Sequence, residues 1–79
     1  MKIKIEGIVE IIKGDIAVLS SLNSSDYDTD LSDLGVDSLD RSSMFLDLEE
    51  NFDVEFTDDD IDVLSTVNKI ASFINDSKS

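Results

Sequence analysis

The chain contains no cysteine, no histidine and no proline in its 79 residues. The lack of cysteine excludes disulfides, thiolate metal sites and a cysteine nucleophile, and the lack of histidine excludes an imidazole base. These two absences remove most of the chemistry that enzymes use. No proline, internal repeat or linker-like segment divides the chain, and its length suits one hydrophobic core. We therefore predict a single domain that spans residues 1–79.

Basic residues are scarce as well: 6 lysines and arginines stand against 19 acids, which gives a formal net charge of −13. Such a charge repels nucleic acid and anionic membranes and attracts proteins with basic patches. Long apolar runs are absent, and Met1–Glu6 alternates charge and isoleucine, unlike a signal-peptide core. We expect a cytoplasmic monomer that binds neither nucleic acid nor membrane and has basic protein partners.

Apolar residues make up 41% of the chain, and their spacing indicates helices separated by polar loops. A first helix is predicted by five residues at helical spacing: Ile5, Ile8, Val9, Ile12 and Ile16. The segment Ser20–Asp30 reads as a loop because its Ser, Asn, Asp and Thr side chains compete for backbone hydrogen bonds. A last helix begins near Ser65 or Thr66, and its apolar stripe consists of Val67, Ile70, Ala71 and Ile74. The tail 76–79 is expected to be frayed.

Two further helices are predicted from their capping residues. A second helix should run from Ser38 to Asn51, with Asp37 placed to cap its first turn. A short third helix should follow Thr57 as N-cap, with three aspartates that complement the positive end of the helix dipole. The sequence therefore predicts an all-α fold: a small four-helix bundle with a long loop between the first two helices and a short third helix.

The predicted second helix has two apolar stripes. At about 100° per residue, one wide stripe suits the core; it contains Met44, Phe45, Leu48 and Phe52. Leu39 and Leu46 lie on the opposite side, next to Asp40 and Asp47. Two interpretations stay open, an acid-edged docking face and ordinary surface leucines. Arg41 points toward the core stripe unless its guanidinium extends to solvent, and the sequence assigns it no role.

A serine at a helix start is by itself weak evidence for a site, but the surroundings of Ser38 are specific. The stretch is Asp33-Leu34-Gly35-Val36-Asp37-Ser38-Leu39-Asp40. It resembles the phosphopantetheine attachment motif of acyl carrier proteins, in which the serine after the aspartate is modified. The resemblance covers about residues 31 to 75 and includes Leu48–Phe52, Thr57–Asp60 and Ser65–Val67.

This resemblance implies a non-catalytic carrier. A phosphopantetheinyl transferase would attach 4'-phosphopantetheine to Ser38, and the arm's thiol would hold acyl groups as thioesters. Acyl-loading and acyl-processing enzymes with basic patches would be the other partners. Their docking surface, carried over by position, would comprise Asp37, Leu39, Asp40, Leu46, Asp47, Glu49 and Glu50. Arg41, Ser42 and Ser43 depart from the usual fatty-acid carriers, so fatty-acid, polyketide and other specialised pathways stay open.

Other classes of function are alternatives to the carrier. The acids of Asp26–Asp30 alternate like the start of an EF-hand calcium loop, but Leu31 stands where the turn needs glycine and Asp37 where a bidentate glutamate is usual. We therefore expect no metal site, with an EF-hand-like calcium-binding module as the alternative. An acidic protein-interaction module without the prosthetic arm is another. Acid pairs on a helix surface, with no substrate cleft, give no basis for catalysis.

Overall fold

The computed structural model describes residues 3–78, and within them the chain forms four α-helices and no β-strand. The helices are α1 (Ile5–Asp15), α2 (Ser38–Phe52), α3 (Asp58–Val63) and α4 (Val67–Lys78). The predicted all-α bundle is thereby confirmed. The end of the chain differs from the expectation of a frayed tail, because α4 continues to Lys78; Ser79 lies outside the described residues.

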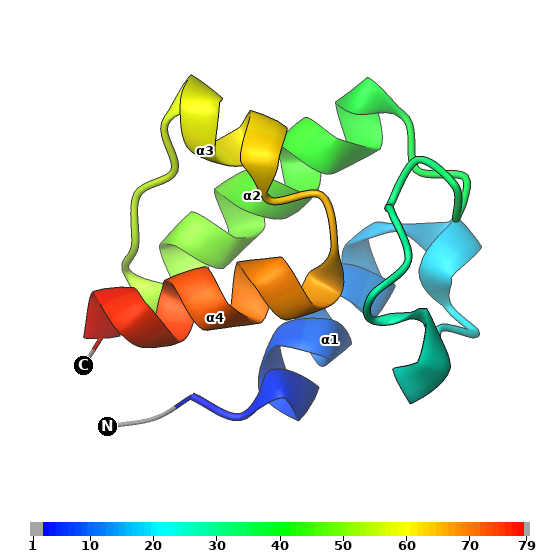
Figure 1. Ribbon diagram of the computed structural model, residues 1–79, viewed down its shortest axis with the longest axis horizontal. Helices are drawn as coiled ribbons and strands as arrows, with labels where there is room; N and C mark the ends of the chain where they lie inside the picture. The colour runs from blue at the N-terminus through cyan, green and yellow to red at the C-terminus, as the bar shows by residue number, and fades with distance from the viewer. Residues whose placement is uncertain (1–2, 79) are drawn as a thin grey trace.

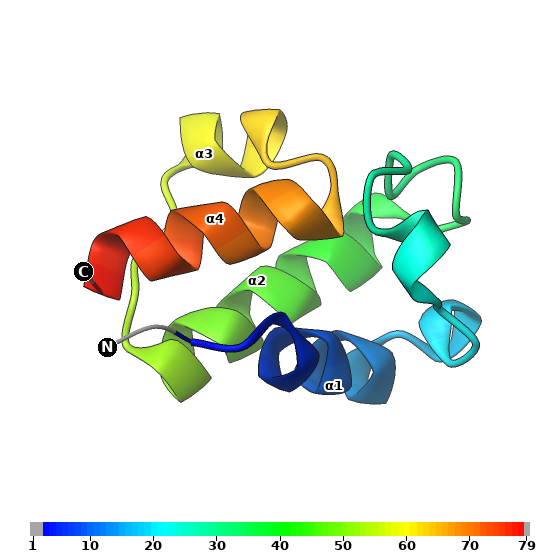
Figure 2. The same cartoon turned by 60° about the horizontal axis from the view of Figure 1, so that its bottom comes forward.

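The core lies where α1 packs against α2 and α4, and α3 covers the side of the molecule away from α1 (Figures 1 and 2). All three long helices bury most of their predicted stripes, and Ile5 and Phe52 are partly buried. The fully buried side chains of these helices are Ile8, Ile12, Met44, Phe45, Leu48, Val67, Ile70 and Ile74. Each such side chain contributes about 1.5–3 kcal/mol by leaving water, so these stripes supply the main stabilisation. Among the described helices, none is both long enough and apolar enough to cross a membrane.

The connection between α1 and α2 is more structured than the predicted loop. It contains two 3₁₀ turns, η1 (Ala17–Leu19) and η2 (Ser24–Asp26), and it buries apolar side chains of its own. Its later part is bonded to the start of α4: the Leu31 N–H donates to Ser65 O at 2.8 Å, and the Asn68 N–H donates to Tyr27 O at 3.0 Å. The connection is therefore a folded part of the bundle.

The short helix α3 begins at the predicted N-cap. The Asp60 N–H donates to Thr57 Oγ1 at 3.1 Å and the Thr57 N–H donates to Asp60 Oδ2 at 3.0 Å, which completes a capping box. Just before α3, the Phe56 ring packs between Phe45 of α2 and Phe73 of α4, with centroid distances of 4.8 and 5.1 Å. These contacts hold a helix that is too short to be stable alone.

Candidate functional site

Ser38 is the first residue of α2, and the residue before it builds the helix start. Asp37 is in extended conformation, and its Oδ1 accepts a hydrogen bond from the Asp40 N–H at 2.8 Å. Its carbonyl oxygen accepts from the Arg41 N–H at 3.0 Å. The amides of Ser38 and Leu39 have no partner inside the helix, as in any first turn. Asp37 thus has a structural role next to the candidate serine.

A tight turn in front of the helix fixes the direction in which the chain enters α2. Gly35 has φ +92°, a conformation that favours glycine, and a Cβ at this position would lie 3.3 Å from Val18 Cγ2. The next amide, Val36 N–H, donates to Leu31 O at 3.1 Å, and the Val36 side chain is buried. This glycine therefore serves the geometry that presents Ser38.

The Ser38 side chain is exposed, and no part of the chain between residues 3 and 78 forms a hydrogen bond with its hydroxyl. The hydroxyl is therefore accessible to an enzyme in solution. With no histidine in the chain, a serine in this position has no imidazole to activate it as a nucleophile. It suits modification by another protein better than catalysis.

The exposed face of α2 continues from Ser38 as an apolar strip. Leu39 is 81% exposed and Leu46 is 61% exposed, and Glu50 is exposed one turn farther on. Helix geometry puts these three side chains on one side, opposite the buried Met44 and Leu48. The structure thus brings together two predicted docking leucines and one predicted docking acid.

Two of the other acids predicted for docking, Glu49 and Asp47, have side-chain contacts inside the molecule. Glu49 is half-buried, and its Oε2 accepts from the Phe56 N–H at 2.8 Å, which ties α2 to the segment before α3. Asp40 is half-buried on the first turn. Asp47 faces the carboxyl group of Asp15 at the end of α1. By helix geometry all three acids stand at the edges of the exposed strip.

Asp15, to which the sequence analysis assigned no role, forms an unusual pair with Asp47. Its Oδ2 is buried without a hydrogen-bond partner among the described residues, although the residue as a whole is only half-buried. Burial raises the pKa of Asp15 to about 6, and Asp47 adds to the shift in two ways: its carboxylate accepts a hydrogen bond from Asp15 when Asp15 is protonated, and its like charge repels the ionised form of Asp15. One signal was available in the sequence: an acid in the last turn of a helix opposes the helix dipole.

Arg41 connects α2 to α3. Its Nη2 donates a hydrogen bond to the carbonyl oxygen of Ile61, twenty residues away in the sequence. Its Nε is buried and finds no acceptor within residues 3–78. The sequence predicted that Arg41 points toward the core stripe, but it predicted no partner for it. The periodicity of one helix does not show which residues of another helix it contacts.

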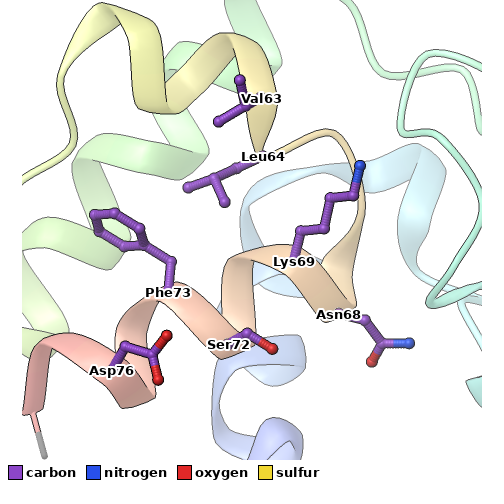
Figure 3. Close-up of a pocket in the computed structure, with 7 residues that line it drawn as sticks. All are labelled: Val63, Leu64, Asn68, Lys69, Ser72, Phe73 and Asp76. Carbon is purple, nitrogen blue, oxygen red and sulfur yellow. The ribbon is translucent and has the colours of Figure 1, made fainter.

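A groove of about 530 Å³ lies between α3 and α4 (Figure 3). Phe73 points from α4 toward α3, and Val63 and Leu64 line the other side at the end of α3 (Figure 3). Lys69 extends toward the segment that joins the two helices. None of the residues predicted as site residues lines this groove.

The acids of the candidate calcium loop are engaged separately. Asp26 Oδ2 accepts from the Asn23 N–H at 3.2 Å, Asp28 Oδ1 accepts from Asn68 Nδ2 at 2.6 Å, and Asp30 Oδ1 accepts from the Ser32 N–H and hydroxyl. The bond from the Ser32 hydroxyl is the main reason that the pKa of Asp30 is lowered. Within the described residues, no group of three or more acidic side chains is arranged to hold a metal ion.

Comparison with known proteins connects this geometry to a family. The family described as "Phosphopantetheine attachment site" matches residues 6–74. An acyl carrier protein of Buchnera aphidicola from Schizaphis graminum is 39% identical over 72 residues, which cover 91% of this chain and 86% of that protein. An acyl carrier protein of Bdellovibrio bacteriovorus is 43% identical over 44 residues, 56% of each chain. No solved structure matches the chain.

Proposed function

Because this chain belongs to the phosphopantetheine attachment family of acyl carrier proteins, we propose that Ser38 carries its covalent 4'-phosphopantetheine arm. The chain is a non-catalytic carrier, and its partners are a phosphopantetheinyl transferase and enzymes that process acyl groups. When attached, the arm supplies the thiol on which acyl groups are held as thioesters. This explains how a chain without cysteine takes part in thioester chemistry.

The observation that carries the proposal is the exposed, unbonded hydroxyl of Ser38 at the start of α2. A phosphodiester on this oxygen needs no rearrangement of the core, because the side chain already points into solvent. The first-turn amides of Ser38 and Leu39 lie at the positive end of the helix dipole, which favours a negative group. The residues around Ser38 therefore fit the arm.

Mass spectrometry of the intact protein tests the attachment site. Incubation with a broad-specificity phosphopantetheinyl transferase, coenzyme A and magnesium should add one phosphopantetheine to the wild-type chain and none to Ser38→Ala. Ser42→Ala and Ser43→Ala are matched controls, because both serines are also exposed on α2; both variants should be modified like the wild type. Modification of Ser38→Ala, or an unmodified wild type with several transferases, would contradict the proposal.

We further propose that partner enzymes dock on the exposed face of α2 around Leu39, Leu46 and Glu50. Exposed leucines beside acids match the apolar centre and polar rim of protein interfaces, and the acidic surface complements a basic enzyme. Asp37, Asp40, Asp47 and Glu49 would form the acidic edge of this surface. Since Asp37 and Glu49 also make internal hydrogen bonds, Glu50 is the most direct residue with which to test docking.

We propose that the carrier serves the biosynthesis of an acyl product. Fatty-acid, polyketide and other specialised pathways are the alternatives. Ser42 and Ser43 are exposed beside the proposed docking face, so they are placed to affect which enzymes bind there. The acyl group found on the purified holo protein from its native cells decides among the pathways. A cytoplasmic, monomeric, single-domain protein remains our proposal for its location and state.

A further inference from the structure

Arg41 is the one base among the 16 charged residues between Asp26 and Asp62. The guanidinium group has five N–H donors. In the described residues one nitrogen, Nη2, bonds to Ile61 O, while Nε is buried and has no acceptor. The buried Nε cannot reach a group outside the protein. Nη1 is not enclosed and has no hydrogen bond in the described residues, so its donors are the ones that a bound group can use.

The position of Arg41 on the helix brings its N–H donors close to Ser38. Residues three apart on a helix are neighbours, with Cβ atoms about 5–6 Å apart. Helical side chains also lean toward the N-terminal end, so the Arg41 side chain leans toward the turn that contains Ser38. The charge of Arg41 also reaches Asp30, in the segment that leads to α2: after the hydrogen bonds from Ser32, it helps to lower the pKa of Asp30.

The acidic surroundings of Ser38 would make a nearby cation favourable for a phosphodiester at this residue. A phosphodiester on Ser38 carries a negative charge, and Asp33, Asp37 and Asp40 lie within five residues of it in the sequence. The repulsion from these carboxylates opposes the attraction of the helix start. Arg41 is the base nearest to Ser38 in the sequence, and the planar guanidinium is well suited to phosphate oxygens.

We propose that Arg41 binds the phosphodiester of the arm while it keeps its hydrogen bond to Ile61 of α3. This inference rests on the proposed attachment of the arm to Ser38. The fork of donors on one guanidinium can serve two acceptors at once, which links the arm to the short helix through one side chain. Arg41 thus binds the prosthetic group and also stabilises α3 through its hydrogen bond to Ile61.

Thermal unfolding of the apo and holo forms separates these two roles. Arg41→Gln should lower the melting temperature of both forms, because the bond to Ile61 is lost. The loss should be larger in the holo form by about 4 °C or more, since the phosphodiester then loses its cation as well. Arg41→Lys keeps the charge but not the fork, and it should recover part of the extra loss in the holo form.

The phosphorus NMR signal of the holo protein gives a second readout that does not depend on any partner enzyme. Arg41→Gln should shift this signal toward that of the free arm. Lys4→Gln is the matched control: it removes one exposed positive charge at the end of the bundle where Ile3 N–H bonds to Asn75, distant from the start of α2 (Figure 1). Lys4→Gln should leave the phosphorus signal unchanged and should change the melting temperature of the apo and holo forms by the same amount.

Equal losses of melting temperature in the apo and holo forms of Arg41→Gln, with an unchanged phosphorus signal, would overturn the proposal and leave Arg41 as a brace for α3 alone. Mass spectrometry of the same samples keeps this outcome separate from failure of the proposed function. If the wild type accepts no arm, the attachment at Ser38 is wrong and this inference is overturned with it. If the arm is attached, the comparison of apo and holo forms decides the role of Arg41.

Discussion

At the scale of single residues, the pair Asp15 and Asp47 stores an unfavourable interaction between α1 and α2. The folded protein raises the pKa of Asp15 from 3.8 to about 6, chiefly by burial. A raised pKa means that the folded state holds the proton more tightly than the unfolded state. The stability that this proton provides is present at acidic pH, and it is lost as the pH rises through about 6.

Asp15→Asn should therefore stabilise the protein at about pH 8, by about 1 kcal/mol or less because the pair is partly open to solvent, and the gain should disappear toward about pH 4. Urea unfolding across this pH range measures the effect. Asp62→Asn, at an exposed position, controls for the change in net charge. A gain for Asp15→Asn that is the same at all pH values, or no larger than that of Asp62→Asn, would contradict the assignment.

At the scale of elements, α2 divides its surface between the core and the proposed partners. Glu50→Lys should weaken binding to a basic acyl-processing enzyme by about fivefold at low salt, because it replaces an attraction at the interface rim by a repulsion. The difference should shrink as salt is added. Surface plasmon resonance measures both effects.

Glu10→Lys is the matched control for this docking test, since Glu10 is exposed on α1, a different helix. It changes the net charge by the same amount and should have a smaller effect. If both reversals weaken binding equally, the interaction depends on overall charge and the assignment of the docking face to α2 is wrong.

The helices themselves were predictable because their signals are local. The apolar residues of the α4 stripe are three or four positions apart, and periodicity identifies them. Thr57 and Asp60 are three positions apart, and the capping rules identify them. Contacts between elements were not predictable in this way. The bond from Arg41 to Ile61 and the pairing of Asp15 with Asp47 depend on how whole helices are placed. The flanking residues in the sequence identified Ser38 as the candidate serine. Its exposure to solvent could be established only from the folded structure.

At the scale of the whole molecule, a net charge of −13 on 79 residues makes self-repulsion a general property of the folded state. Raising sodium chloride from about 0.1 M to about 1 M shortens the Debye length from about 10 Å to about 3 Å. The melting temperature should therefore rise by several degrees, as measured by circular dichroism. The double variant Glu50→Lys, Asp62→Lys reduces the net charge and should gain less from salt. A melting temperature that is flat or falls with salt would show that repulsion does not limit stability.

The proposed attachment site, Ser38, and the exposed Leu39 of the proposed docking face are adjacent residues. With the arm on Ser38 and a partner on this face, a thioester would be confined to a volume set by the length of the arm, so its delivery would become an intramolecular event at high effective concentration. Capture of the cargo then does not require a strong complex between the two proteins. A small, brief contact is sufficient, and it allows one carrier to visit successive enzymes quickly.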